Sequence, residues 1–153
     1  MEHEGKEILL NLNKVNEIIE ILIIKENLLK KSYTNIQKEK YIKNFKSDLL
    51  LETENDFEIV EIKTVITDQE KAVFPNLNSK RSVEQLKKIK ELLKQGYKVK
   101  YIIAALSPYI KTVELNPEYL EFTRLFKQCK LLGMKVSIVK LYQINKEIKY
   151  SFL

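Results

Sequence analysis

Strand patterns and helix patterns alternate between residues 60 and 142, and this order constrains the fold more than any other feature of the sequence. It reads strand, helix, strand, helix, strand, which is typical of a mixed sheet with helices on its faces. The strand expected at residues 98–106 contains the unbroken apolar run YIIAAL, as in a strand that is covered on both faces. The sequence therefore predicts an α/β fold, a mixed β-sheet flanked by helices.

The individual elements follow from the hydrophobic period and from the few glycines and prolines. Helices are expected at residues 14–31, 80–95 and 117–132; Asn13 caps the first, Gly96 ends the second, and Asn116-Pro117 and Gly133 bound the third. Strands are expected at residues 45–52, 57–66, 98–106, 134–144 and 147–152. The first two form an antiparallel hairpin around the turn at residues 53–56, whereas the pattern of residues 32–44 fits either a strand or a loop.

Composition limits the class of protein. The chain has 153 residues, of which 44% are apolar, so we expect one domain with a core over residues 1–153, residues 1–10 being flexible or a short strand. The single cysteine, Cys129, excludes a disulfide scaffold and a Cys-based zinc site. The single histidine, His3, stands at the start and is expected to be disordered, which removes His-based catalytic triads.

Membrane and nucleic-acid partners are judged from the apolar runs and the charges. The longest apolar stretch, residues 18–24, is interrupted by Glu20 and is too short to span a bilayer, so no membrane partner and a cytoplasmic location are expected. Arg81 and Arg124 are the only arginines, so 25 of the 27 Lys+Arg residues are lysines. The net charge of +6 is therefore weak support for nucleic-acid binding, because specific phosphate and base readers prefer arginine.

Three residues on the predicted hairpin stand out chemically. Asp48 lies in the apolar segment SDLLL, where it could reach water at a strand start or edge. Glu61 and Lys63 share one face of the strand 57–66. One interpretation is that they form a salt bridge that faces solvent. Antiparallel pairing can, however, bring Asp48 beside Glu61, and two close carboxylates favour a divalent cation, Mg²⁺ or Mn²⁺ rather than zinc. Lys63 would then orient a water or stabilise charge on a phosphate oxygen, and this is the skeleton of PD-(D/E)xK nucleases.

A longer run of sequence carries a family resemblance. Residues 60–66 read VEIKTVI and residues 74–86 read FPNLNSKRSVEQL. They resemble, without a gap, the signature of the sugar fermentation stimulation protein A family, V-E-V-K-x-V-T-L and then F-P-D-A-x-T-E-R-G-x-x-H-L. Further similarity extends the resemblance over roughly residues 11–142, at positions 16–20, 33–39, 46–51, 116–119 and 133–136.

The resemblance implies a PD-(D/E)xK, restriction-endonuclease-like fold with Asp48 and Glu61 as metal ligands and Lys63 as the catalytic lysine. The resemblance also implies that Glu20 holds a metal-bound water. Glu20 can equally be a helix residue at the edge of an apolar stripe. Gln85 stands where the family has histidine and would hydrogen-bond a phosphate or a water.

Nucleic-acid contacts are expected from Arg81, Lys80 and Lys46. Of these, Arg81 matches the family arginine, which implies a phosphate contact or a role in strand pairing. Arg81 also reads as a surface residue at a helix start. Asn76, Lys80 and Ser82 depart from the family pattern, and these departures leave the Asp48, Glu61 and Lys63 core intact.

The family is described as DNA-binding and joins an N-terminal OB-like domain to a nuclease-like domain. About ten residues precede the first expected helix, so the chain is expected to match the second domain alone. The predicted function is a divalent-metal-dependent DNA phosphodiesterase, with RNA and a homodimer left open. Two alternatives remain, a non-catalytic DNA-binding regulator linked to sugar metabolism and a partner-binding domain without nucleic-acid activity.

Overall fold

The computed structural model describes the backbone of residues 2–3, 6–8 and 14–153 and the side chains of residues 14–153. Its helices are α1 (Val15–Lys25), α2 (Lys80–Lys94) and α3 (Leu120–Leu131). The central sheet has the spatial order β1 (Glu2–His3), β2 (Lys6–Ile8), β11 (Lys135–Ile144), β9 (Lys98–Ala105), β7 (Phe57–Val65), β6 (Leu49–Glu52) and β3 (Asn35–Lys38), with β12 (Glu147–Phe152) paired to β11. Two separate pairs join β4 (Tyr41–Ile42) to β5 (Phe45–Lys46) and β8 (Lys71–Phe74) to β10 (Thr112–Leu115).

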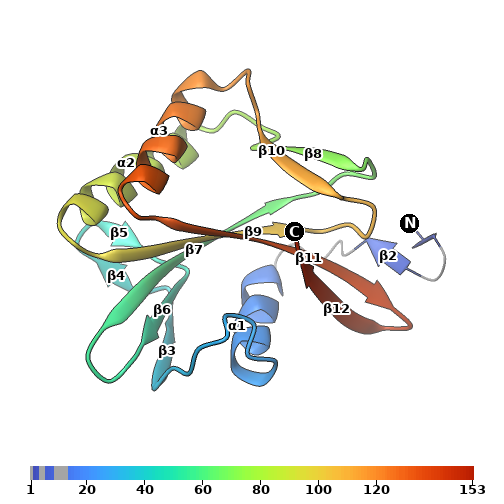
Figure 1. Ribbon diagram of the computed structural model, residues 1–153, viewed down its shortest axis with the longest axis horizontal. Coiled ribbons are helices and arrows are strands. Elements are labelled where there is room, and N and C mark those ends of the chain that lie inside the picture. Colours follow the sequence, from blue (N-terminus) through green and yellow to red (C-terminus); the bar gives the residue numbers. More distant parts are fainter. Residues whose placement is uncertain (1, 4–5, 9–13) are drawn as a thin grey trace.

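The sheet is mixed, as predicted. β7, β9 and β11 run parallel to one another, while β3, β6, β2 and β12 join by antiparallel pairing. Figure 1 shows α2 and α3 on one side of the sheet and α1 on the other. The α/β class with helices on the faces of a mixed sheet is therefore confirmed.

Alternation along the central strands divides the interior into two cores. Ile59 and Val65 of β7 belong to the cluster that α2 and α3 cover, whereas Val60 and Ile62 belong to the cluster that α1 covers. Glu61 falls between Ile59 and Val65 on the α2 side and is only 2% exposed. A carboxylate is thus placed under a helix, in the middle of the sheet.

The first helix is shorter than predicted. It ends at Lys25 rather than at residue 31. Asn27 takes a left-handed conformation with φ of 51°, and the N–H of Leu28 donates to the carbonyl of Leu22. Asparagine adopts this conformation readily, so the chain turns back there. The proposed cap Asn13 lies outside the described residues.

The predicted strand 45–52 is divided in two. Ser47 and Asp48 interrupt it, so that β5 pairs with β4 while β6 pairs with β3 and β7. The hydroxyl and the N–H of Ser47 both donate to the carbonyl of Lys40, which fixes the change of direction. The undecided segment 32–44 supplies β3 and β4.

The third helix begins later than predicted, at Leu120. Asn116 does not cap it: its Oδ1 accepts from the N–H of Glu118 in a turn, and its Nδ2 donates to the carbonyl of Pro75. The parallel pair β8–β10 was not predicted. The N–H of Asn116, just after β10, donates to the carbonyl of Phe74 and so joins the C-terminal ends of the two strands. The predicted glycine ends of α2 and α3 are confirmed, because Gly96 and Gly133 have φ of 93° and 109°.

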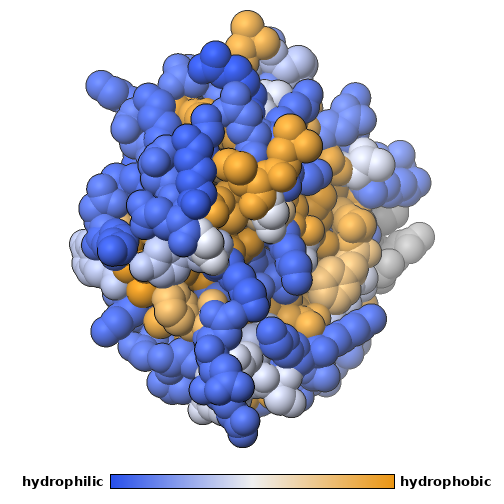
Figure 2. Space-filling view, turned by 60° about the vertical axis from the view of Figure 1, so that its left-hand side comes forward, coloured by the Kyte–Doolittle hydropathy of each residue, from blue (hydrophilic) through white to orange (hydrophobic). Residues whose placement is uncertain are grey.

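None of the helices that the structure describes is long and apolar enough to cross a membrane. On the face drawn in Figure 2, an apolar area is bordered by hydrophilic side chains. Large apolar side chains that are exposed on the molecule include those of Ile24, Leu77, Leu120 and Leu131.

Candidate metal centre

The hairpin register brings Asp48 to Glu61. Leu49 pairs with Val60 across β6 and β7, and the N–H of Asp48 donates to the carbonyl of Val60 at 3.0 Å. The Asp48 carboxylate does not simply reach into water at an edge. Its Oδ2 accepts from the N–H of Ile62 at 2.7 Å, and its Oδ1 accepts from the Asn16 side chain at 3.1 Å. Two hydrogen bonds therefore fix the orientation of this carboxylate.

Glu61 and Lys63 form a largely buried ion pair rather than one that faces solvent. Lys63 Nζ lies 2.9 Å from Glu61 Oε1 and also donates to Gln85 Oε1 at 2.7 Å. The Gln85 side chain comes from α2, which covers this face of β7. An ammonium group has three N–H donors, so these two contacts leave the third for a water or a ligand oxygen.

The electrostatics of the site disfavour two free carboxylates. Burial, and secondly the charge of Asp48, raise the pKa of Glu61 from 4.5 to about 7, although Lys63 and Arg81 act in the opposite direction. Burial also raises the pKa of Asp48, against the hydrogen bond from Ile62 and the charge of Lys63. The pKa of Glu61 is thus raised in spite of Lys63 and Arg81, and a further cation beside the two acids would relieve the repulsion.

The donor set suits a hard divalent cation. Glu61 Oε2 is buried and has no hydrogen-bond partner among the described residues. In the described part of the chain, no group of three or more His, Cys, Asp and Glu side chains is placed to hold a metal. The two carboxylates Asp48 and Glu61 match the habit of Mg²⁺, which is bound by one or two carboxylates and completes its shell with water and substrate oxygens.

The other predicted site residues do not all lie at the candidate metal centre. Glu20 of α1 forms an ion pair with Lys38 of β3, at 3.2 Å between Oε2 and Nζ, and not with Lys63 of the centre. Arg81 and Lys46 line a groove beside Asp48. Lys80 lies in a different hollow, between the N-terminal ends of α2 and α3, so the structure does not bring it together with Arg81 in the groove.

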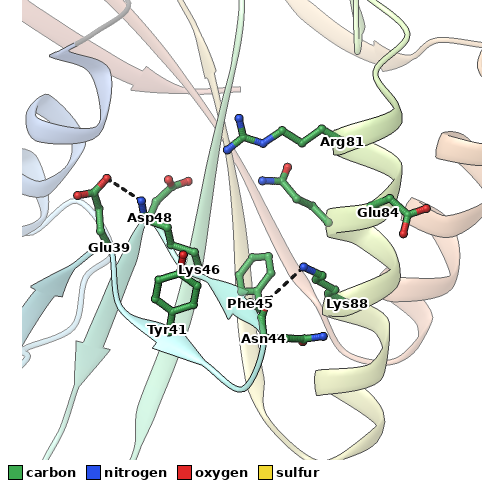
Figure 3. A pocket seen from close by; sticks show the side chains of 10 residues that line it. Glu39, Tyr41, Asn44, Phe45, Lys46, Asp48, Arg81, Glu84 and Lys88 are labelled. Carbon is green, nitrogen blue, oxygen red and sulfur yellow. Dashed lines mark hydrogen bonds and ion pairs between the residues drawn. The ribbon is translucent and has the colours of Figure 1, made fainter.

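The groove separates the β4–β5 hairpin from α2 and has a volume of about 330 Å³. Figure 3 shows the hairpin residues on one side and Arg81, Glu84 and Lys88 on the other, with Asp48 at the upper end. The groove is lined by Glu39, Tyr41, Asn44, Phe45, Lys46, Asp48, Arg81, Glu84, Gln85 and Lys88. The candidate metal centre therefore borders, through Asp48, a cavity that is large enough for a small ligand.

Sequence reasoning missed three residues around this centre. Asn16 reaches Asp48 from α1, and Tyr41 and Lys88 face the groove. No signal in the sequence singled out Tyr41 or Lys88, because each stands in an unremarkable polar segment. Asn16 belongs to the stretch that resembles the family, and that position was a signal for it.

Comparisons with known proteins all point to the same family. A family model described as the sugar fermentation stimulation protein RE domain matches residues 13–147. Homologues of the sugar fermentation stimulation protein from Thermosipho melanesiensis and Clostridium beijerinckii are 32% and 29% identical over 119 and 126 residues, or 74% and 81% of this chain. The matched stretches cover 50% and 55% of the length of the two relatives, so the chain spans about half the length of these proteins.

A solved structure with the same fold is that of Pyrococcus furiosus SfsA in complex with Ca²⁺. The TM-score is 0.87 at 20% identity, and the match covers 99% of this chain and 68% of that one. At this identity the likeness establishes the fold alone.

Proposed function

Because the chain belongs to the sugar fermentation stimulation protein family, we propose that it is a DNA-binding protein of nuclease fold and a divalent-metal-dependent DNA phosphodiesterase. The observation that carries the proposal is the trio formed by Asp48, just before β6, and by Glu61 and Lys63 of β7. Asp48 and Glu61 meet across the hairpin, and Lys63 is held between Glu61 and Gln85. The Ca²⁺ complex of the P. furiosus relative supports a site for hard divalent cations in this fold.

Asp48 and Glu61 would hold Mg²⁺ or Mn²⁺. When bound, such an ion lowers the pKa of a water and neutralises charge on a phosphate oxygen. The contribution of Lys63 is positional: two of its N–H groups are fixed by Glu61 and Gln85, so the third is aimed without further loss of side-chain freedom. That N–H orients the attacking water or donates to a phosphate oxygen. The P–O bond to water forms as the ester P–O bond breaks; the attacking water gives up a proton to solvent, and the leaving oxygen takes one up.

Cleavage of plasmid and single-stranded DNA with Mg²⁺ or Mn²⁺ tests the proposal. We expect Lys63→Ala and Asp48→Ala each to lower the cleavage rate about 10²- to 10⁴-fold, because each removes a group that acts on the reacting phosphate. Lys149→Ala is the matched control, since Lys149 forms the same Glu-x-Lys pair with Glu147, but on an exposed strand. Metal-independent cleavage, or activity that survives both substitutions, rejects the proposal.

The second candidate function is a DNA-binding regulator linked to sugar metabolism that does not cut. The names of the relatives favour it, as does Gln85 in the place of a histidine that could exchange protons. Retention of DNA in a gel-shift assay, with no cleavage after addition of either metal, would favour this function over hydrolysis.

A further inference from the structure

One wall of the groove beside Asp48 has no part in metal binding. Tyr41 lines this wall and is 63% exposed, so one face of a large aromatic ring is open to a ligand. In the β4–β5 hairpin, Tyr41 pairs with Lys46 and Ile42 pairs with Phe45. Because side chains alternate along a strand, Ile42 and Phe45 pack towards the core and anchor the hairpin, while the Tyr41 ring stands free on its outer side.

The opposite wall carries a cation, Arg81, whose charge acts on Glu61 but which forms no ion pair among the described residues. Arg81, from the first turn of α2, has no carboxylate within ion-pair distance among the described residues. The acids that line the groove are already engaged: Asp48 accepts from Ile62 and Asn16, Glu39 pairs with Lys46 at 3.4 Å, and Glu84 pairs with Lys87 at 3.0 Å. Figure 3 shows the Arg81 guanidinium extended across the upper end of the groove towards Asp48. Arg81 is therefore free to bind an anionic group next to the candidate metal centre.

The dimensions of the groove limit what can enter it. Its volume of about 330 Å³ is at the lower end of the range for ligand clefts, roughly 300–1,000 Å³. Lys88 Nζ donates to the carbonyl of Asn44 at 3.1 Å, which bridges the tip of the hairpin to α2. A paired base in a duplex is stacked on both sides and presents no face to an aromatic ring outside it.

We propose that the groove holds one unpaired nucleotide beside the scissile phosphate, with the base on the Tyr41 ring and a phosphate near Arg81. The preferred substrate is then single-stranded DNA rather than duplex. Stacking on an aromatic side chain needs no particular base, because every base has a π-face, so the preference is for strandedness and not for sequence. This inference rests on the proposed function and gives it a substrate class.

Fluorescence anisotropy in EDTA tests the inference without cleavage, using a labelled single-stranded oligodeoxythymidylate and a duplex of the same length. Wild type is expected to bind the single strand more tightly. Tyr41→Ala is expected to weaken that binding roughly 5- to 100-fold, which corresponds to the loss of one stacked base, and to leave duplex binding unchanged. Tyr41→Phe keeps the ring and is expected to bind like wild type.

The control is Phe152→Ala, which removes an aromatic side chain of similar exposure, 47%, from β12. It is expected to change neither affinity. A Tyr41→Ala protein that binds the single strand as wild type does, or a wild type that prefers the duplex, overturns the inference. Cleavage in Mn²⁺ is scored separately: Tyr41-dependent binding without cleavage rejects hydrolysis alone, and cleavage that ignores Tyr41 and strandedness rejects the groove assignment alone.

Discussion

Glu61 occupies a buried position in which the charged form of its carboxylate is disfavoured. It is 2% exposed, lies beside Asp48, and its Oε2 has no hydrogen-bond partner among the described residues. A core-facing strand position of this kind would ordinarily carry an apolar side chain, because a buried ion pair seldom repays its desolvation. On the proposed function, a bound cation would compensate for the cost of burying this carboxylate.

Glu61→Gln measures that cost directly. Glutamine keeps the shape and the Oε1 acceptor but removes the charge. In metal-free protein above pH 7, where the Glu61 carboxylate is ionised, the substitution is expected to raise the free energy of unfolding by about 1–3 kcal/mol, because burial has shifted the pKa from 4.5 to about 7. Urea denaturation in EDTA provides the measurement.

The control for this substitution is Glu147→Gln, which removes a carboxylate of an exposed ion pair and should change the stability by less than about 1 kcal/mol. The same Glu61→Gln protein is expected to lose the rise in melting temperature that Mn²⁺ gives wild type. A less stable Glu61→Gln protein would contradict this account of the site.

At the scale of elements, the sequence was most informative where a pattern is both local and regular. The period-two run of β7 and the turn at residues 53–56 predicted a hairpin that can bring Asp48 beside Glu61, and the register of the structure does so. The boundaries of α2 followed from its apolar stripe and from Gly96, whose positive φ no other residue type adopts as easily.

Elements that depend on distant partners were not predictable in this way. The pair β8–β10 joins segments about 40 residues apart, and neither strand has an alternating pattern that is long enough to be recognised. The break at Ser47 depends on hydrogen bonds to Lys40, and the side of the hairpin that Tyr41 occupies depends on how Phe45 packs under α2. Such tertiary contacts leave no periodic trace in the sequence.

The packing of α3 on α2 can be followed through the single thiol. Cys129 is 0% exposed, its Sγ lies 3.6 Å from the carbonyl of Leu86, and burial raises its pKa to about 11. At pH 8 the native thiol is expected to react with Ellman's reagent at least about 100-fold more slowly than the same chain in urea, because both the thiolate fraction and access are low. Equal rates in the two conditions would show that the two helices separate readily.

At the scale of the whole molecule, the charge of +6 is spread over many lysines that pair with glutamates on the surface. These pairs contribute little to specific binding. If the groove holds a strand, log Kd should vary linearly with log salt, and Arg81→Ala should reduce the slope by about 0.7, the value for one phosphate of a single strand.

The matched control is Arg124→Ala, which removes the only other arginine of the chain, on α3 and outside the groove. It should leave the slope unchanged. A slope that responds equally to both substitutions would assign the salt dependence to diffuse charge instead of to the groove.

The candidate site takes its parts from both sides of the sheet. Asn16 reaches Asp48 from α1, and Gln85 reaches Lys63 from α2 on the opposite face. Each helix is docked by its own apolar core, so the two layers can loosen separately. Release of α1 would separate Asn16 from Asp48, and release of α2 would separate Gln85 from Lys63, while most strands remain paired. On the proposed function, activity would therefore be lost on partial unfolding before much secondary structure is lost.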